Sequence, residues 1–122
     1  MMRITLKGCP PSLNAFAGRN NVWDYRKEKA SWTNAVIWSC KASKDKPARP
    51  YPMADVIITY YFPRKCRHDA DNYAGKFLLD GLTRAGVIVD DDLDHIHLHI
   101  AGRVDRLNPR TVITVKEVED GC

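Results

Sequence analysis

The sequence predicts an α+β fold in a single domain over residues 1–122, with a mixed sheet, two helices and the order β-α-β-α-β-β. Three observations support this prediction. The length of 122 residues is that of one domain. The composition, 44% hydrophobic and 28% charged, is that of a globular protein. Period-two and helical patterns alternate along the chain, and breaks containing proline or glycine separate them.

The first half contributes a strand, a helix and a second strand. Residues 3–8 place Ile4 and Leu6 on one face of a short strand, which Pro10 and Pro11 end. A long loop follows, and then a helix over 25–43. Its apolar positions fall at helical spacing and predict a buried stripe of Trp32, Ala35, Val36, Ser39 and Cys40. Residues 54–62 are apolar on both faces, which predicts a central strand covered on both sides.

The second half contributes another helix and two strands. The helix is predicted over 71–85, ending at Gly86. Its apolar face comprises Phe77, Leu78, Leu82 and Ala85, and its polar stripe comprises Asn72, Lys76 and Asp80. In the strand at 95–104, Ile96, Leu98 and Ile100 face one way, and three histidines face the other. The last strand is expected near 111–118.

Charge and cysteine content suggest a class of protein. Residues 1–67 carry 13 Lys and Arg against 4 Asp and Glu, whereas residues 68–122 carry 6 against 11. This asymmetry indicates either a polyanion partner beside a carboxylate-rich site, or charges that mix on the folded surface. The four cysteines form no CxxC pair, so we expect free thiols in a cytoplasmic protein. No apolar run is long enough for a membrane span, and no signal peptide is recognisable.

Asp69 and Asp71 lie between a strand end and a helix start, where catalytic groups are often found. Residues at i and i+2 of an extended segment point the same way, so the two carboxylates can converge on one cation. Oxygen ligands without histidine or thiolate suit Mg²⁺, with Mn²⁺ as a possible substitute. Either aspartate could instead simply cap the helix.

Other charged residues extend this site. The run Asp90-Asp91-Asp92 supplies a third carboxylate or a solvated acidic turn, and a helix of fourteen residues would place it roughly 20 Å away. It can meet the first pair only if the chain doubles back or a second subunit contributes. Lys76 either contacts a phosphate or pairs with Asp80. Cations just before the pair would place a phosphodiester backbone or form a plain basic loop: Arg64, Lys65 and Arg67.

Histidines offer a different chemistry. His95, His97 and His99 alternate along one strand and could bind zinc, or form the half-exposed face of a sheet. His68 precedes the aspartate pair and could assist proton transfer. A protein that uses the three histidines for zinc is therefore an alternative to a magnesium enzyme.

Several segments together resemble the RusA family of Holliday junction resolvases, small homodimeric endonucleases. The matching segments are PPSLN, RHDADN, GKFLLDGLTRAGVI, VDDDLDHI and NPRTVITVKEVE, at residues 10–14, 67–72, 75–88, 89–96 and 108–119. The resemblance covers most of the chain. It implies crossover junction endodeoxyribonuclease activity on branched DNA by an intertwined homodimer that needs no small-molecule cofactor.

The resemblance also assigns roles to positions. Asp69, Asp71 and Asp91 match the family's metal-binding aspartates, with Asp90 and Asp92 leaving the register of the third slightly open. Lys76 resembles the catalytic lysine, although it stands four residues after Asn72, where many members have three. The implied DNA contacts are Asn14, Arg19, Arg64, Lys65, Arg67 and Lys76. The alternative that keeps the basic half is a structure-selective DNA-binding module without catalysis.

Overall fold

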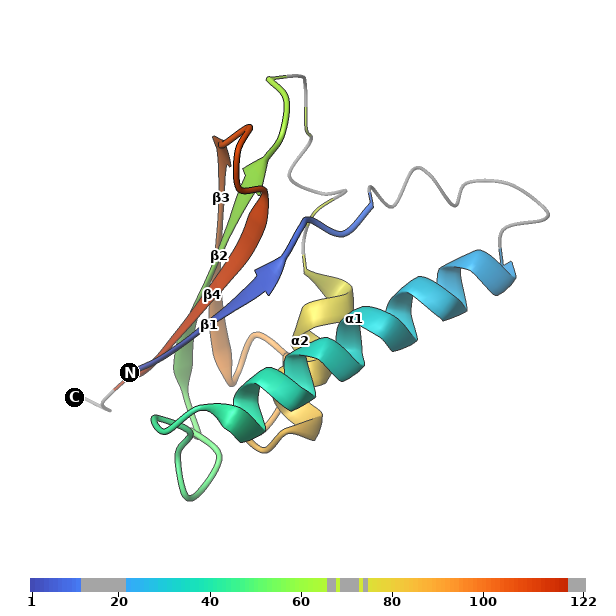
Figure 1. Ribbon diagram of the computed structural model, residues 1–122. Coiled ribbons are helices and arrows are strands. Elements are labelled where there is room, and N and C mark those ends of the chain that lie inside the picture. Colours follow the sequence, from blue (N-terminus) through green and yellow to red (C-terminus); the bar gives the residue numbers. More distant parts are fainter. Residues whose placement is uncertain (12–21, 66–67, 69–72, 74, 119–122) are drawn as a thin grey trace.

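The computed structural model describes residues 1–11, 22–65, 68, 73 and 75–118. These residues form one domain with four strands in a mixed sheet and two helices (Figure 1). The elements are β1 (Met2–Lys7), α1 (Val22–Ala42), β2 (Ala54–Phe62), α2 (Lys76–Arg84), β3 (Ile96–Val104) and β4 (Arg110–Glu117). The predicted fold class and element order are confirmed. Within the described residues, neither helix is long and apolar enough to cross a membrane.

The sheet has the spatial order β1-β4-β2-β3. Strands β2 and β3 run parallel, with Ile58 opposite Ile100, whereas β4 runs antiparallel to both β1 and β2. The last strand of the chain therefore lies between the first two. β2 has a partner on each side, which confirms the prediction that it is a central strand.

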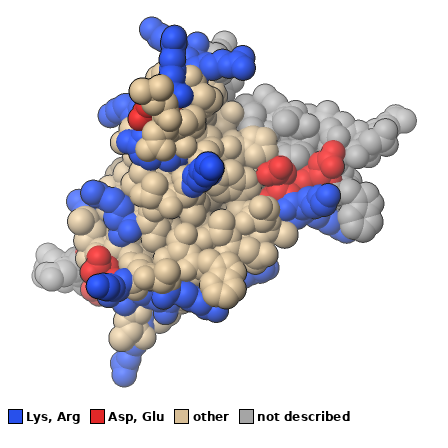
Figure 2. All heavy atoms as spheres, viewed as in Figure 1, with Lys and Arg blue, Asp and Glu red and all other residues tan. Residues whose placement is uncertain are grey.

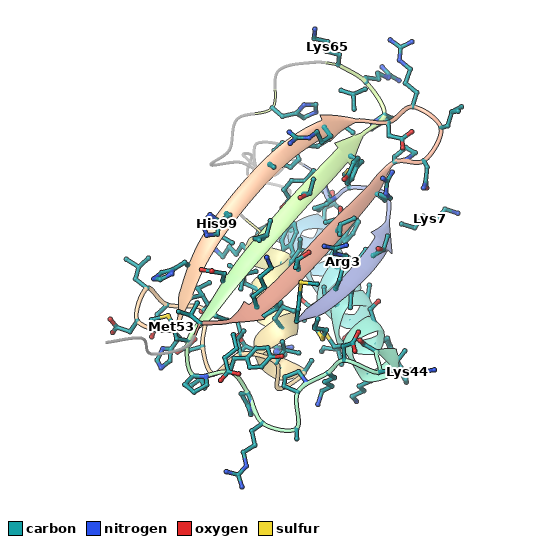
Figure 3. The ribbon with its side chains drawn as sticks, turned by 90° about the vertical axis from the view of Figure 1, so that its left-hand side faces the viewer. Arg3, Lys7, Lys44, Met53, Lys65 and His99 are labelled. Atoms are coloured by element: carbon teal, nitrogen blue, oxygen red, sulfur yellow. The ribbon has the colours of Figure 1, made fainter. Side chains whose placement is uncertain are left out.

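Both helices lie on one face of the sheet, and no helix or strand of the described residues covers the other face, here called the open face (Figures 1 and 3). Side chains of β2 are alternately buried and half-buried. The buried series, which includes Val56, Ile58 and Tyr60, packs with Val36 of α1 and Leu82 of α2. The predicted coverage of β2 on both faces is wrong, because only the helical side is buried.

Most of the predicted apolar positions lie in the core, with one exception on β3. Ile96 is buried and Ile100 is half-buried, but the side chain of Leu98 is 38% exposed. β3 is the outer strand beside β2, and a side chain on an outer strand has a neighbouring strand on one side only. On α1, Val36 and Cys40 are buried as predicted, and Thr33 joins them by donating a hydrogen bond to the carbonyl of Phe77 at 3.0 Å.

The second helix begins at Lys76 and not at residue 71 as predicted. Gly75 precedes it with φ of +83°, in the left-handed region that a continuing α-helix excludes and that glycine tolerates. A Cβ at this position would also collide with the Ile58 side chain. At the other end, Gly86 has φ of +79° and ends the helix as predicted. α1 begins at Val22, three residues earlier than predicted.

Candidate active site and nucleic-acid surface

Asp91 lies on an exposed turn between α2 and β3. Its backbone N–H donates to the Asp90 carboxylate at 2.8 Å. The segment after α2 turns back beside the helix, and Asp91 comes within electrostatic reach of Asp80, in the middle of α2. Partial desolvation raises the pKa of Asp91, and the carboxylates of Asp90 and Asp80 raise it further. The chain therefore doubles back after α2 and brings this turn towards the middle of the helix, which is one of the two arrangements considered from the sequence.

The neighbouring aspartate has a structural task. The Asp92 carboxylate accepts a hydrogen bond from the backbone N–H of Asp94 at 3.1 Å and contacts Nδ1 of His95 at 2.5 Å. These contacts hold the turn that leads into β3. The contact with Asp92 raises the pKa of His95, which favours its protonated form.

Lys76 is the first residue of α2 and is exposed. Its Nζ lies 5.8 Å from the ring centroid of Tyr25 on α1. The alternative in which Lys76 pairs with Asp80 is wrong, because Asp80 forms an ion pair with Lys29 of α1 at 2.9 Å. A cation at a helix N-terminus opposes the helix dipole, so this position favours an anion brought from outside.

Asp69 and Asp71, the predicted metal-binding pair, lie outside the described residues, as do Asn14, Arg19 and Arg67. Among the residues that are described, no group of three or more His, Cys, Asp or Glu side chains is placed to hold a metal ion. Asp80, Asp90 and Asp91 are therefore not a complete site by themselves.

The described residues on either side of the paired aspartates are both held against β2. The His68 ring stacks on Phe62 with centroids 3.6 Å apart and planes 5° apart. The Tyr73 ring meets the same Phe62 edge-on at 5.1 Å. The buried Tyr60 hydroxyl donates to the carbonyl of Tyr73 at 2.7 Å. This aromatic cluster holds His68 and Tyr73 against β2.

The three alternating histidines do not converge on one point. His95 contacts Asp92 in the turn, while Nδ1 of His97 lies 3.2 Å and Nε2 of His99 lies 3.7 Å from the Asp55 carboxylate on β2. The zinc alternative, which needs all three together, is not supported. The alternative of a half-exposed sheet face fits better, because His97 and His99 are exposed on the open face.

The predicted cations after β2 belong to a larger basic group that includes residues of later strands. Arg64 and Lys65 are exposed beyond the end of β2. Because β3 runs parallel to β2, Arg103 lies opposite Tyr61 near the same end, and Arg106 follows in the next loop. Figure 2 shows Lys and Arg side chains gathered at this end of the molecule. Sequence reasoning missed the later residues, which are separated from Arg64 by about forty positions of chain.

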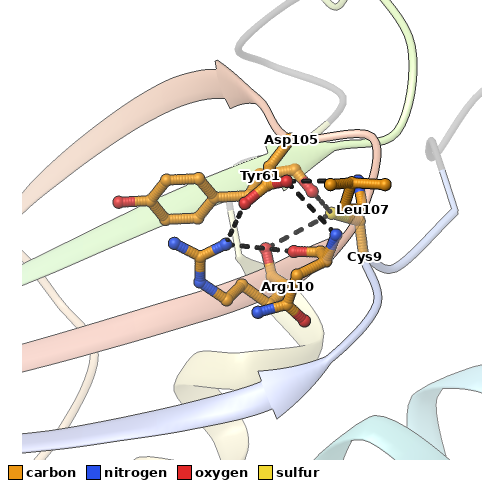
Figure 4. A network of polar contacts seen from close by, with 6 residues as sticks. Cys9, Tyr61, Asp105, Leu107 and Arg110 are labelled. Carbon is orange, nitrogen blue, oxygen red and sulfur yellow. Dashed lines mark hydrogen bonds and ion pairs between the residues drawn. The ribbon is translucent and has the colours of Figure 1, made fainter.

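A polar network fixes the base of this basic end (Figure 4). Arg110 donates to the Asp105 carboxylate at 2.7 Å, and its guanidinium lies 3.7 Å from the Tyr61 ring centroid. The Cys9 thiol donates to the carbonyl of Tyr61 at 3.3 Å. Burial raises the pKa of the Cys9 thiol, and it raises that of Cys40 to about 11, so both are free, protonated thiols at neutral pH. The prediction of free thiols is confirmed for these two; Cys66 and Cys122 lie outside the described residues.

Comparison with models of known families places this chain beside one group of nucleases. The model of the RusA family, described as Endodeoxyribonuclease RusA, matches residues 10–116, which is most of the chain. The chain belongs to the RusA family. No curated protein matches it. Membership of the RusA family implies endonuclease activity on DNA and confirms the resemblance seen in the sequence motifs.

The matched region spans both candidate regions. It includes Asp91, Lys76 and the basic end, together with Asp69 and Asp71. For a RusA-family nuclease, the structure thus provides a surface carboxylate with a raised pKa, an exposed lysine at a helix start and a cationic edge. The lysine and the cationic edge suit a phosphodiester substrate, which is an anion.

Proposed function

We propose that this protein is a Mg²⁺-dependent endonuclease that resolves four-way DNA junctions by paired symmetric nicking, and that it acts as a homodimer in DNA recombination and repair. The observation that carries the proposal is the position of Asp91. In a chain of the RusA family, this exposed carboxylate lies beside two further carboxylates that raise its pKa. Repulsion between neighbouring carboxylates does not stabilise the folded protein, and a divalent cation bound by them relieves this repulsion.

Asp69, Asp71 and Asp91 would hold the metal, for which Mn²⁺ is a possible substitute. Magnesium bound there would activate water and stabilise negative charge on the scissile phosphate. His95 and the backbone of Asp94 engage Asp92, which supports Asp91 as the third ligand. His68 and Tyr73, which flank Asp69 and Asp71 in the sequence, are both held on β2, which supports a site at this end of the sheet.

Cationic side chains would bind and orient the DNA. Lys76, at the start of α2, would place its ammonium group near the scissile phosphate, where negative charge develops. Arg64 and Lys65 at the basic end would contact backbone phosphates, which position a duplex without reading its sequence. Asn14, Arg19 and Arg67 are proposed to add contacts of the same kind.

The homodimer accounts for paired nicking. A two-fold dimer presents two equivalent sites, and a four-way junction presents two equivalent strands. Cleavage at both sites yields two nicked duplexes, whereas a single site would leave the junction joined. An intertwined arrangement would also let neighbouring chains complete each other's acidic sites.

The test is cleavage of a synthetic four-way junction by the full chain, with Mg²⁺ and with Mg²⁺ removed by chelation. Asp71→Asn and Asp91→Asn are expected to bind the junction and fail to cut it. Asp94→Asn removes one exposed carboxylate from the same turn and should cut normally. Cleavage by Asp90→Asn and by Asp92→Asn shows whether either of these residues, and not Asp91, is the third metal ligand.

Unchanged cleavage by the Asp71 and Asp91 variants, or by the parent protein in chelator, would overturn the metal assignment. Junction binding by the parent protein without cleavage in Mg²⁺ or Mn²⁺ would instead establish the non-catalytic DNA-binding alternative. Analytical ultracentrifugation of the parent protein tests the dimer directly, because a monomer cannot present two sites.

A further inference from the structure

The open face of the sheet carries cations in a regular arrangement. At one end, strand pairing places Lys7 of β1, Arg110 of β4, Tyr61 of β2 and Arg103 of β3 in one row across all four strands. Neighbouring strands are about 4.8 Å apart, so the row is about 14 Å wide. Farther along the same face, Arg3 lies opposite Thr114 and Lys116 lies opposite Asp55. Figure 3 looks onto this face, with Arg3 and Lys7 labelled.

Within the described part of the chain, two charged side chains on this face contact an ionisable neighbour and four form no ion pair. Arg110 is paired with Asp105, and Asp55 lies against His97 and His99. The remaining cations are exposed, and none of them forms an ion pair with a carboxylate of the described residues: Arg3, Lys7, Arg103 and Lys116. Among the described residues, cations on this face outnumber carboxylates, so the open face carries a net positive charge.

We propose that the open face is a second nucleic-acid surface, on which Arg3, Lys7, Arg103 and Lys116 bind the phosphate backbone of a DNA duplex arm. The charge of the face selects a polyanion. A second copy of the chain is disfavoured, because a two-fold contact through this face would bring like charges together. Its apolar groups, such as Ile57 and Val112, are half-buried between the polar rows and do not form a continuous apolar patch.

The geometry favours a duplex over a single strand. Surfaces for single strands usually offer aromatic rings on which bases stack. The aromatic ring in the cationic row is Tyr61, and the Arg110 guanidinium already covers it at 3.7 Å. The exposed groups that remain are mainly charged, and charged groups recognise backbone phosphates irrespective of base sequence.

This inference deepens the proposed function and rests on it for the identity of the partner. Lys76 and α2 lie on the helical side of the sheet, and the open face lies on the other side (Figures 1 and 3). A duplex on the open face is therefore separate from the phosphate at Lys76. In a four-way junction, whose arms point in different directions, it would be an arm other than the one being cut.

The experiment measures binding of a fluorescent 20-base-pair duplex to the full chain by anisotropy, without metal, over a range of salt concentrations. The test variant combines Arg3→Gln, Lys7→Gln, Arg103→Gln and Lys116→Gln. The control combines Lys41→Gln, Lys44→Gln, Arg49→Gln and Arg84→Gln, which removes equal charge from exposed positions of α1, α2 and the α1–β2 connection.

The test variant should bind at least tenfold more weakly than the parent at low salt. The slope of log K against log salt should become shallower by up to about 3.6, since each lost phosphate contact removes about 0.9. The slope of the control should differ from that of the parent by no more than about 0.9, the contribution of one phosphate contact. Equal losses in both variants would show that only net charge matters and would overturn the proposal, as would parental binding by the test variant.

Two further measurements keep this result separate from the proposed function. Sedimentation velocity and far-UV circular dichroism of both variants show whether each keeps the parent's assembly and fold. A change of assembly in the test variant alone would make the open face an interface between copies and overturn the proposal. Binding of a plain duplex does not require cleavage of a junction. If the parent protein does not cut the junction, this result overturns only the nuclease assignment.

Discussion

Gly81 lies where α2 packs against α1, and replacing it tests how closely the two helices approach. A Cβ at this position would lie 2.5 Å from Cβ and 2.7 Å from Cγ1 of Val36, and 3.0 Å from the carbonyl oxygen of Thr33. Carbon atoms in ordinary contact are about 3.5–4.0 Å apart. The Val36 Cβ and the Thr33 carbonyl belong to or adjoin the backbone of α1, so side-chain rotation does not relieve the clash. The helices must separate by about 1 Å.

The magnitude follows from two opposing effects in Gly81→Ala. Alanine favours a helix over glycine by about 1 kcal/mol. Overpacking of a core costs about 1–3 kcal/mol, and displacement of α2 also strains the buried hydrogen bond from Thr33 to the Phe77 carbonyl. We expect a net loss of about 1–2 kcal/mol in the free energy of unfolding. The midpoint of thermal unfolding should fall by roughly 4–10 °C.

The assay is urea denaturation followed by circular dichroism at 222 nm, with Val36→Ala and the double variant as companions. Val36→Ala leaves a cavity and destabilises the protein, but it removes the Cγ1 atom that the new methyl group meets. The double variant should therefore be more stable than the sum of the two single effects predicts, by about 1 kcal/mol. A Gly81→Ala protein about 1 kcal/mol more stable than the parent would refute the close packing, because helix propensity would then be the only effect observed.

Two further predictions concern Tyr60 and Asp91. Tyr60→Phe should lower the free energy of unfolding by about 1 kcal/mol, because it removes the hydroxyl that donates to the Tyr73 carbonyl; denaturation measures this, and equal stability would argue against the bond. Partial desolvation and two carboxylates raise the pKa of Asp91, so in metal-free protein it should protonate at a higher pH than a free aspartate. A carboxyl NMR titration measures this pKa, and Asp90→Asn should lower it towards the usual value. Since a raised folded pKa means proton uptake on folding, the unfavourable effect of Asp91 on stability should diminish as pH falls through that pKa; an unshifted titration would contradict the crowding.

Local patterns in the sequence predicted most elements to within three residues at each end. β2 matches its predicted range, because Ala54–Phe62 is an apolar strand closed by Pro63. The start of α2 differs by five residues. Asn72 and Lys76 fall at helical spacing with Asp80, yet Gly75 interrupts the series with a left-handed backbone that fits against Ile58. Periodicity does not reveal such a break, because it depends on a neighbour from another element.

The candidate site was predicted in part. The sequence motifs predicted Asp91 and Lys76 as site residues, and the structure places Lys76 exposed at the start of α2 and Asp91 on an exposed turn after it; their roles stay predictions. The alternative that paired Asp80 with Lys76 was wrong, because Lys29 of α1 forms the ion pair with Asp80. The i, i+4 spacing rule considers only residues of the same helix and does not detect a partner from another helix. Asp69 and Asp71 lie outside the described residues, so their role as metal ligands stays a prediction.

The sequence by itself determined the kind of protein: the α+β class, the order of elements and the family motifs, all of which reside in short segments. The tertiary structure alone decided what those segments face. Insertion of β4 between β1 and β2 brings Lys7, Arg110 and Arg103 into one row, although about a hundred residues separate the first from the others. Strand pairing and helix packing join distant residues through contacts that no local period encodes. The position of the Asp91 turn beside α2 and the cationic open face therefore became visible only when the chain was folded.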